Sequence, residues 1–517
     1  MALGAKQEMS FGKKFVKNSL YGVLEFAWPI FLSIAATPFI VRSLGVDAYG
    51  ILSIVMVTLG FFGLLDMGLS LAAVRDIAEH YEKKDFKEIN RVLSSILLSY
   101  LVIGTFGALL IVFSADFLTT KVLNIPEQYL EVSKLAFYIA ALGFLINMIA
   151  GVLGSIPKAV QRYDVSTKIS MVFGTATTIL TVTILYLGYG LREVVLLNLG
   201  ISIVTGTVYL MVAKKLIPEI RIGFKFYKDI FFRLFKFGGF FLITGISGLI
   251  LMQLDKLLIG SLITVSVVTF YVVPSSITQR IQGLITSAVN ILLPVTSALA
   301  GTGQQDRLQK VYRSVIKVVL LVATSISIPI FVFSGKFLLY WLGPDFANQS
   351  TIVMMFLVPT YFLLGVTSVP WGISLGIGKS SVNAFFSVLV AVLNVALIFV
   401  LYKPFGLNGI AAAYLLSVIV VNPIAIYYIE KNILKLSGYE FWHIYYKIFL
   451  LGIVQGAIAY LVIPLATSFI ATVGLMGLSA LILPILYIIF KMPTEEERNL
   501  FSTLISKFTG QKNDSSI

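Results

Sequence analysis

The stretch Val112-Phe113-Ser114-Ala115-Asp116-Phe117-Leu118 recurs 220 residues later as Val332-Phe333-Ser334-Gly335-Lys336-Phe337-Leu338. Each copy closes an apolar run that is long enough to cross a bilayer, because a helix needs about 20 apolar residues to span the hydrocarbon core. The same offset places the seventh apolar run of the chain onto the first. The sequence therefore predicts two parallel six-helix copies, followed by two further helices.

The composition excludes a water-soluble protein. Of 517 residues, 58% are hydrophobic and only 12% are charged, whereas a soluble domain is about one quarter charged. The predicted fold class is an all-α integral membrane protein with about 14 transmembrane helices. The first run is too long for the core of a signal peptide and is interpreted as an uncleaved span. The predicted spans are 21–41, 51–74, 92–114, 135–156, 165–187, 194–213, 238–262, 269–299, 315–335, 351–375, 382–402, 407–429, 446–468 and 470–490.

These spans predict a domain organisation with two lobes. The segments are a cytoplasmic N-terminal segment 1–20, an N-lobe 21–213, a cytoplasmic interfacial linker 214–237, a C-lobe 238–429, spans 13 and 14 within 446–490, and a cytoplasmic tail 491–517. Within the linker, residues 224–236 mix aromatic side chains with lysines, a pattern typical of a helix that lies in the plane of the membrane surface. Duplicated halves generally place a substrate site at their interface.

The distribution of basic residues predicts the orientation. If the N-terminus is cytoplasmic, 31 of the 39 Lys and Arg residues fall in inside segments and six in outside loops, as the positive-inside rule requires. Both termini are therefore predicted to be cytoplasmic. The net charge of +14 is explained by this orientation, so we expect no nucleic-acid partner.

Several kinds of chemistry are excluded or disfavoured. The chain has no cysteine, which excludes disulfides and thiolate metal sites, and its two histidines, His80 and His443, are far apart in sequence. We therefore expect no metal site, no cofactor and no enzymatic activity. Gly378-Lys379-Ser380 resembles the end of a phosphate-binding loop, but Ile373 occupies the position that needs glycine, so ATP does not power transport on this chain.

Polar residues inside predicted spans are the candidate functional residues, because such groups are costly in a bilayer. They occur on spans 1, 2, 7 and 8, which are matching positions of the two halves, and Arg42 follows span 1. The candidates within spans are Glu25, Asp66, Gln253, Asp255, Lys256 and Arg280.

Two roles follow from the chemistry of these groups. Lys256 and Arg280 are predicted to clamp a diphosphate, arginine by its planar fork and lysine as a point charge; Arg42 and Gln253 complete the candidate substrate-binding set. Asp66, Asp255 and Glu25 are predicted cavity acids, each a candidate site for Na⁺ or H⁺ as a coupling ion. Asp255 and Lys256 are neighbours, about 100° apart on a helix, so both cannot point into one narrow cavity. Two structural roles remain alternatives to these functional ones. In the first, one of the neighbours Asp255 and Lys256 pairs with Arg280 only to stabilise the fold; in the second, Arg42 and Glu25 only anchor span 1 at the membrane interface.

Several motifs resemble those of prokaryotic oligosaccharide-lipid flippases, the O-antigen and polysaccharide branch of the multidrug/oligosaccharidyl-lipid/polysaccharide exporter superfamily. The similar stretches are Arg42-Ser43-Leu44-Gly45-Val46-Asp47-Ala48-Tyr49-Gly50, Leu65-Asp66-Met67-Gly68-Leu69, Arg75-Asp76-Ile77-Ala78, Gln161-Arg162-Tyr163, and Leu254-Asp255-Lys256-Leu257-Leu258-Ile259-Gly260 followed by Tyr271 and Leu293-Pro294. The chain departs from the family in residues 264–270, which lack the glycine that the family commonly carries in the turn between spans 7 and 8.

The resemblance implies two six-helix bundles around a central cavity and transport by alternating access. It implies as cargo a polyprenyl-diphosphate-linked oligosaccharide that moves from the inner to the outer leaflet of the cell membrane, for cell-surface polysaccharide or glycan assembly. Membrane lipids and polysaccharide assembly proteins are the other expected partners.

Three alternatives stay open at the level of sequence. A multidrug/cation antiporter of the same superfamily favours acids and few cations in its cavity, which Lys256 and Arg280 oppose. A peptidoglycan lipid-precursor flippase is expected to carry several arginines in and beside span 1, where only Arg42 is found. A membrane-embedded glycosyltransferase is the remote alternative, because such enzymes generally need acids near a metal or a large outer loop.

Overall fold

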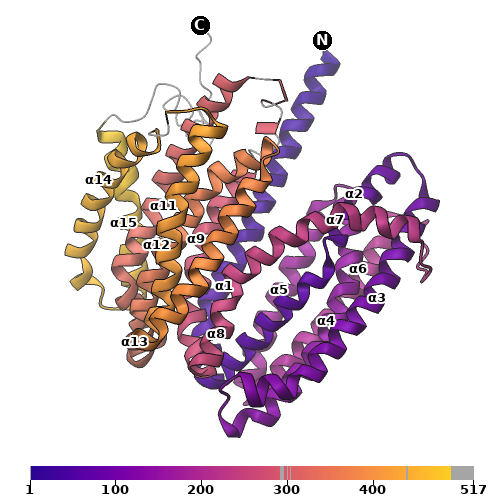
Figure 1. Cartoon of the computed structure of the whole chain (residues 1–517), viewed down its shortest axis with the longest axis horizontal. Helices are drawn as coiled ribbons and strands as arrows, with labels where there is room; N and C mark the ends of the chain where they lie inside the picture. Colours follow the sequence, from indigo (N-terminus) through magenta and orange to yellow (C-terminus); the bar gives the residue numbers. More distant parts are fainter. Residues whose placement is uncertain are drawn as a thin grey trace. The chain divides into compact units, whose positions relative to one another are not determined.

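A computed structural model describes residues 2–290, 296–297, 299, 301–302, 304–437 and 440–490 of the chain (Figure 1). The described residues form helices and connecting turns, and no strand occurs among them. Nine helices of this described part are long and apolar enough to cross a membrane. The all-helical fold class is therefore confirmed, and the chain is a multi-pass membrane protein.

The elements follow one another with short connections. In chain order they are α1 (Ala2–Phe62), η1 (Gly63–Asp66), α2 (Leu69–Glu82), α3 (Phe86–Phe117), η2 (Leu118–Val122), η3 (Glu127–Tyr129), α4 (Leu130–Ala159), α5 (Tyr163–Tyr186), α6 (Leu191–Leu216), α7 (Lys228–Leu249), η4 (Ile250–Leu254), α8 (Asp255–Leu262), α9 (Val265–Asn290), α11 (Gln305–Leu342), α12 (Pro344–Gly376), α13 (Ser380–Tyr428), η5 (Ile429–Ile433), α14 (Glu440–Leu461), η6 (Ile463–Leu465) and α15 (Phe469–Ile489).

Most predicted spans lie inside helices, but the second does not form one continuous helix. Spans 3–6 lie within or nearly within α3–α6, and the two copies of the repeated motif lie at or near the C-terminal ends of α3 and α11. α1 contains a non-helical residue, Gly45 (φ 80°, ψ 163°), a conformation that a side chain disfavours, and this break separates the first two predicted spans. The predicted span 51–74 is corrected because Met67 (φ 51°) and Gly68 (φ 70°) interrupt it.

The linker after α6 also differs from the expectation. The helix expected over 224–236 begins only at Lys228, because residues 217–227 are not helical, and it is not a separate helix; its position in the plane of the membrane stays a prediction. From there α7 continues to Leu249 without a break between the linker residues and the seventh predicted span.

The chain divides into two compact units. Unit 1 comprises residues 1–277 and 384–417, and unit 2 comprises residues 278–383 and 418–517. In unit 1, α4 packs against α1, α2, α3, α5 and α6. The predicted lobes 21–213 and 238–429 stay a prediction.

Small residues explain why the helices around α4 approach so closely. A Cβ on Gly104 would lie 2.7 Å from Leu145 Cδ1, one on Gly107 would lie 2.6 Å from Phe144 Cε1, and one on Gly206 would lie 3.3 Å from the Cβ of Ala150. Close packing of this kind is a main source of helix association in lipid, where apolar contact with a neighbour replaces apolar contact with lipid tails.

Unit 2 packs around α11, which contacts α12, α14 and α15. A buried amide joins three of these helices: Gln455 on α14 donates to the carbonyl oxygens of Ser325 on α11 (3.0 Å) and Ser479 on α15 (2.9 Å). Since no water is present in a bilayer core to satisfy such groups, these hydrogen bonds fix the two C-terminal helices onto α11.

Candidate functional site

A cavity of about 390 Å³ lies inside unit 1, between the second part of α1, η1, α2, α3 and α4. Its walls are mainly apolar, and Asp66 is the charged residue among those that line it. The lining residues are Leu59, Gly60, Gly63, Asp66, Ser70, Tyr100, Phe144, Asn147, Met148 and Gly151.

The break at residues 67–68 positions Asp66 in this cavity. Asp66 ends η1, and its Oδ1 accepts hydrogen bonds from the hydroxyl (2.7 Å) and the backbone N–H (3.3 Å) of Ser70 in the first turn of α2. The hydroxyl of Tyr100 on α3 also donates to Oδ1. Neutral donors from two helices therefore hold the carboxylate, and this oxygen-rich setting suits a proton or a small hard cation.

Gln253, Asp255 and Lys256 are brought together at the π-helical turn η4. Lys256 Nζ donates to the carbonyl oxygen of Met252 (2.7 Å) and to Oε1 of Gln253 (2.9 Å), and the side chains of Asp255 and Lys256 are both buried. The Gln253 amide lies over Gly60, since a Cβ on Gly60 would come 3.6 Å from its Nε2. Gln253 thus connects Lys256 to the wall of the Asp66 cavity, while the ammonium group is held by its own helix. π-Helical turns of this kind occur frequently at functional sites.

The remaining candidates lie elsewhere. Arg42 is exposed and precedes the break at Gly45; the helical segment from Val46 to Phe62 places it about 25 Å along the axis from Asp66, so the two do not share this cavity. Arg280 is half-buried in the part of α9 that belongs to unit 2. The side chain of Glu25 lies outside the described residues.

A second polar cluster holds three turns of unit 1 together, and we call it the turn seal. Asn124 donates from its side chain to the carbonyl oxygens of Ser261 (2.8 Å), in the last turn of α8, and Ile263 (3.0 Å), in the connection to α9. The backbone N–H of Asn124 bonds the carbonyl oxygen of Gly260 (3.0 Å). Residues 265–270, expected in the glycine-free turn, instead begin α9, and the short connection between α8 and α9 is held by an asparagine from another part of the chain.

The turn after Gly45 completes the turn seal. Ser266 donates its hydroxyl to Asp47, and Thr269 Oγ1 donates to the carbonyl oxygen of Val46 (2.6 Å). Gly50 is essential to this approach, because a Cβ there would lie only 2.0 Å from the carbonyl oxygen of Val265. The seal therefore joins the first predicted loop to the residues that follow α8, at one end of unit 1.

Gly50→Ala is expected to open the turn seal. The added methyl group overlaps a backbone oxygen that cannot rotate away, and overpacking of this size costs about 1–3 kcal/mol. In a Ser266→Cys background, we expect a thiol reagent to label the purified protein about tenfold faster when Gly50→Ala is present. Gly174→Ala is the control, since a Cβ there meets nothing within 4 Å; equal labelling in both variants would contradict the expectation.

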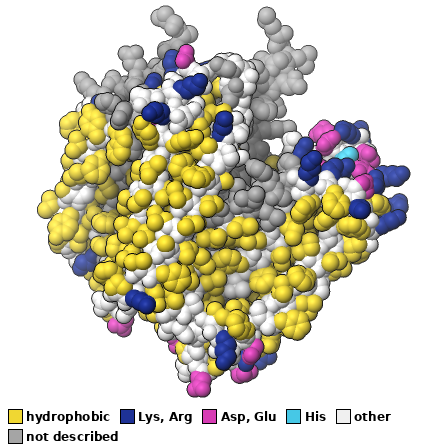
Figure 2. Space-filling model, viewed as in Figure 1, with side chains coloured by type: hydrophobic (Ala, Val, Ile, Leu, Met, Phe, Trp, Pro, Cys, Tyr) yellow, Lys and Arg dark blue, Asp and Glu magenta, His cyan; other side chains and the backbone are white. Residues whose placement is uncertain are grey.

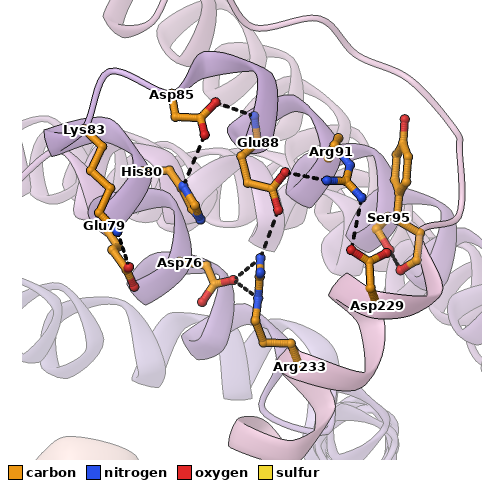
Figure 3. Close-up of polar contacts among 11 residues, drawn as sticks. Asp76, Glu79, His80, Lys83, Asp85, Glu88, Arg91, Ser95, Asp229 and Arg233 are labelled. Atoms are coloured by element: carbon orange, nitrogen blue, oxygen red, sulfur yellow. Dashed lines mark hydrogen bonds and ion pairs between the residues drawn. The ribbon is translucent and has the colours of Figure 1, made fainter.

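An ionic cluster lies at another end of unit 1, where α2, α3 and α7 meet (Figure 3). Arg233 of α7 pairs with Asp76 of α2 (2.8 Å) and Glu88 of α3 (3.4 Å). Arg91 of α3 pairs with Glu88 (2.8 Å) and with Asp229 of α7 (3.0 Å). Figure 2 shows this charged end beyond the hydrophobic side chains that cover the helices. The cluster fixes the start of α7 onto α2 and α3.

Sequence reasoning found Asp66 but missed the groups around it. Ser70 follows Asp66 by four residues, which in an unbroken span places both side chains on one helix face, but in the structure the break at residues 67–68 brings them together instead. Tyr100 lies within a run of apolar and serine residues in α3, and no local pattern marks it. Asn124 and Ser266 were missed as well: Asn124 lies in a short loop and Ser266 in the first turn of α9, and neither belongs to a recognisable motif.

The sequence profile of the family described as polysaccharide biosynthesis protein matches residues 39–351, more than half of the chain. The chain belongs to this polysaccharide biosynthesis protein family. The Asp66 cavity, the turn seal and the α7–α8 region all lie within the matched residues. The resemblance seen in the sequence motifs is confirmed.

Two curated relatives cover most of the chain. EpsK of Bacillus subtilis (strain 168), an uncharacterized membrane protein, is 24% identical over 443 residues, which is 84% of this chain and 86% of EpsK. A putative O-antigen transporter of Shigella flexneri is 22% identical over 409 residues, which is 78% of this chain and 95% of that protein. The similarity thus extends over most of the length of both relatives.

Solved structures show the same fold. The lipid II flippase MurJ in an inward closed conformation superposes with a TM-score of 0.69 at 14% identity, covering 91% of this chain and 99% of MurJ. An inward-facing multidrug resistance transporter of the MATE family, in the MOP superfamily, gives a TM-score of 0.67 at 17% identity, covering 80% of this chain and 98% of that transporter. At these identities the likeness establishes the transporter fold for this member of the polysaccharide biosynthesis protein family.

Proposed function

We propose that this protein is a flippase that moves a polyprenyl-diphosphate-linked oligosaccharide from the inner to the outer leaflet of the cell membrane by alternating access. It has 14 spans in two six-helix bundles around a central cavity, two added C-terminal helices, and both termini in the cytoplasm. It performs no catalytic step and works with polysaccharide assembly proteins as partners. Membership of a polysaccharide biosynthesis family, with a putative O-antigen transporter among its relatives, is the observation that carries this proposal.

The turn seal supports the alternating-access part of the proposal. In the proposed orientation, the turns around Asp47 and Ser266 lie on the outer side, whereas the ionic cluster lies on the cytoplasmic side. The seal then closes the outer end in this conformation, and its hydrogen bonds must break before cargo leaves. Because it consists of a small number of hydrogen bonds, its opening is compatible with repeated transport cycles.

The Asp66 cavity supports coupling to an ion. A carboxylate held by neutral hydroxyls is a suitable site for H⁺ or Na⁺. The coupling ion is proposed to bind at Asp66, and no organic cofactor is proposed to take part. Ser70 bonds Asp66 at the start of α2, and α2 also carries Asp76 of the ionic cluster, so α2 connects the cavity to the charged end of unit 1.

The diphosphate clamp of Lys256 and Arg280 remains a prediction. Lys256 is bonded to Met252 and Gln253 in this conformation, so headgroup binding must replace these contacts. We expect Lys256→Gln and Arg280→Gln each to slow the flipping of a labelled polyprenyl-diphosphate oligosaccharide in proteoliposomes by about ten- to a hundredfold. A change of this size corresponds to the loss of at least one hydrogen bond to a charged group.

The controls for this experiment are Lys121→Gln and Arg192→Gln, which remove the same kinds of charge from exposed positions outside the proposed cavity. We expect both controls to flip at the parent rate. Parent-like flipping in Lys256→Gln and Arg280→Gln would remove the clamp while leaving transport established. No flipping by the parent protein would overturn the proposed function itself.

A multidrug/cation antiporter is the second candidate, and one observation favours it. The charged residue among those lining the 390 Å³ cavity is an acid, which suits a cationic cargo better than an anionic one. The same proteoliposomes distinguish the two: uptake of an organic cation driven by an ion gradient, without oligosaccharide flipping, would favour the antiporter. A peptidoglycan lipid precursor serves as a third substrate in that assay.

A further inference from the structure

A second cavity of unit 1, separate from the Asp66 cavity, lies where the linker before α7 crosses the start of α3. Its volume is about 740 Å³, and it is lined by both segments. The lining includes Lys87, Asn90 and Arg91 from α3, and Arg221, Gly223 and Tyr227 from the linker. Here we call it the linker pocket; no step of the proposed transport uses it.

Hydrogen bonds hold the two walls of the linker pocket in fixed positions. Asn90 donates to the carbonyl oxygen of Glu219 (2.9 Å) and accepts from the backbone N–H of Arg221 (2.7 Å). Gly223 lies so close to α3 that a Cβ there would come 2.8 Å from Ser94 Oγ. The non-helical linker is therefore attached along its length to α3, and the pocket is a built feature of the fold.

Of the three basic side chains that line the pocket, one is ion-paired and two are not, within the part of the chain that the structure describes. Arg91 is paired with Glu88 and Asp229 and lies 4.6 Å above the centre of the Tyr227 ring. Lys87 and Arg221 are both exposed and take part in no ion pair among the described residues. Glu219 is the acid of the lining. Three basic groups thus face one acidic group, and two of the basic groups are available to a ligand.

The surroundings of the pocket are apolar. Five large apolar side chains of the linker and α7 are exposed: Ile222, Phe224, Phe226, Phe232 and Phe235. Side chains of this kind are normally buried in a water-soluble protein. Aromatic and basic residues side by side are typical of the boundary between headgroups and acyl chains. The pocket opens at the level of the membrane surface if α3 spans the bilayer from this end.

We propose that the linker pocket binds the phosphate headgroup of an anionic membrane phospholipid, with Lys87 and Arg221 as the charged ligands and Tyr227 beside them. The exposed phenylalanines contact the acyl chains of the same lipid. Because the linker leads directly into α7 and is fixed to α3, bound lipid stabilises the attachment of α7 to this end of unit 1. The site is independent of the transported cargo.

The test uses the full chain in nanodiscs that contain equal amounts of phosphatidylcholine and phosphatidylglycerol. Native mass spectrometry of the released protein measures the ratio of the two retained lipids. We expect the parent to retain phosphatidylglycerol in preference, and Lys87→Gln/Arg221→Gln to reduce that preference about ten- to thirtyfold, since each basic residue near a membrane contributes a similar electrostatic increment. Both positions are exposed, so the variant is expected to fold.

Lys214→Gln/Lys215→Gln is the matched control, because it removes the same charge from exposed residues in the last turn of α6. We expect this control to behave as the parent. An equal loss in the control, or no loss in the pocket variant, would overturn the proposal. A further arm adds inorganic pyrophosphate: displacement of phosphatidylglycerol from the parent by this soluble anion would assign the pocket to soluble phosphates and overturn the lipid site.

Discussion

The oxidised D47C/S266C variant is expected to transport no faster than protein-free vesicles and to recover when a reductant is added. In the structure the Ser266 hydroxyl donates to Asp47 in the turn seal, and we expect cysteines at these two positions to be oxidised to a disulfide, which requires the two Cβ atoms to lie close together. A closed seal prevents release on the outer side of the proposed membrane orientation. The readout is flipping of the labelled lipid-linked oligosaccharide before and after reduction.

The chain contains no cysteine, so the two introduced thiols can form a disulfide within one molecule only with each other. The matched controls are the single variants D47C and S266C under the same oxidising treatment, because neither can form the disulfide within the chain. We expect each single variant to transport at the same rate before and after oxidation. Full transport by a D47C/S266C protein whose thiols are shown to be oxidised would exclude the turn seal as a gate.

Asp66→Asn is expected to fold normally and to lose coupled transport. Asparagine keeps the size of the side chain and an oxygen that accepts from Ser70 and Tyr100, but it removes the negative charge that an ion needs. We expect transport to fall by about an order of magnitude, within the range typical of coupling free energies. Transport should also lose its dependence on an imposed proton or sodium gradient, which is measured by varying each gradient separately.

Asp345→Asn provides the control for the charge change, since Asp345 is an exposed acid in the first turn of α12. We expect this variant to retain both the rate and the gradient dependence of the parent. If Asp66→Asn keeps its gradient dependence, the coupling ion does not bind at this carboxylate. A parent protein that is insensitive to both gradients would show that transport is uncoupled.

The membrane-spanning nature of the chain was predictable because hydrophobicity alone decides it. Apolar runs of the required length place the spans, and the chain follows them closely from α3 to α6 and from α11 to α15. The break after Asp66 was not predicted, because Met67 adopts a positive φ without any local signal and only the following glycine suggests it. The start of α7 was misplaced because aromatic–lysine alternation describes an environment and does not fix where a helix begins.

The candidate site was predictable in its charged members and not in its geometry. Asp66 stood out as a carboxylate in an apolar run, but its partner Tyr100 comes from a different helix, and such tertiary pairs leave no trace in local sequence. Lys256 also stood out, yet the direction of its ammonium group depends on the π-helical turn that exposes the Met252 carbonyl. Sequence patterns report which groups are costly to bury, whereas tertiary packing decides which of them meet.

The small residues around α4 limit how this protein can change over evolutionary time. Gly104, Gly107 and Gly206 each face a neighbour that leaves no room for a larger side chain, whereas Val102 and Phe106 on the outer face of α3 are exposed. Exposed positions of this kind tolerate exchange among apolar types, because lipid accepts any of them. We expect substitutions to accumulate on that outer face, whereas the glycines at the contacts of α4 with α3 and α6 are expected to be substituted rarely.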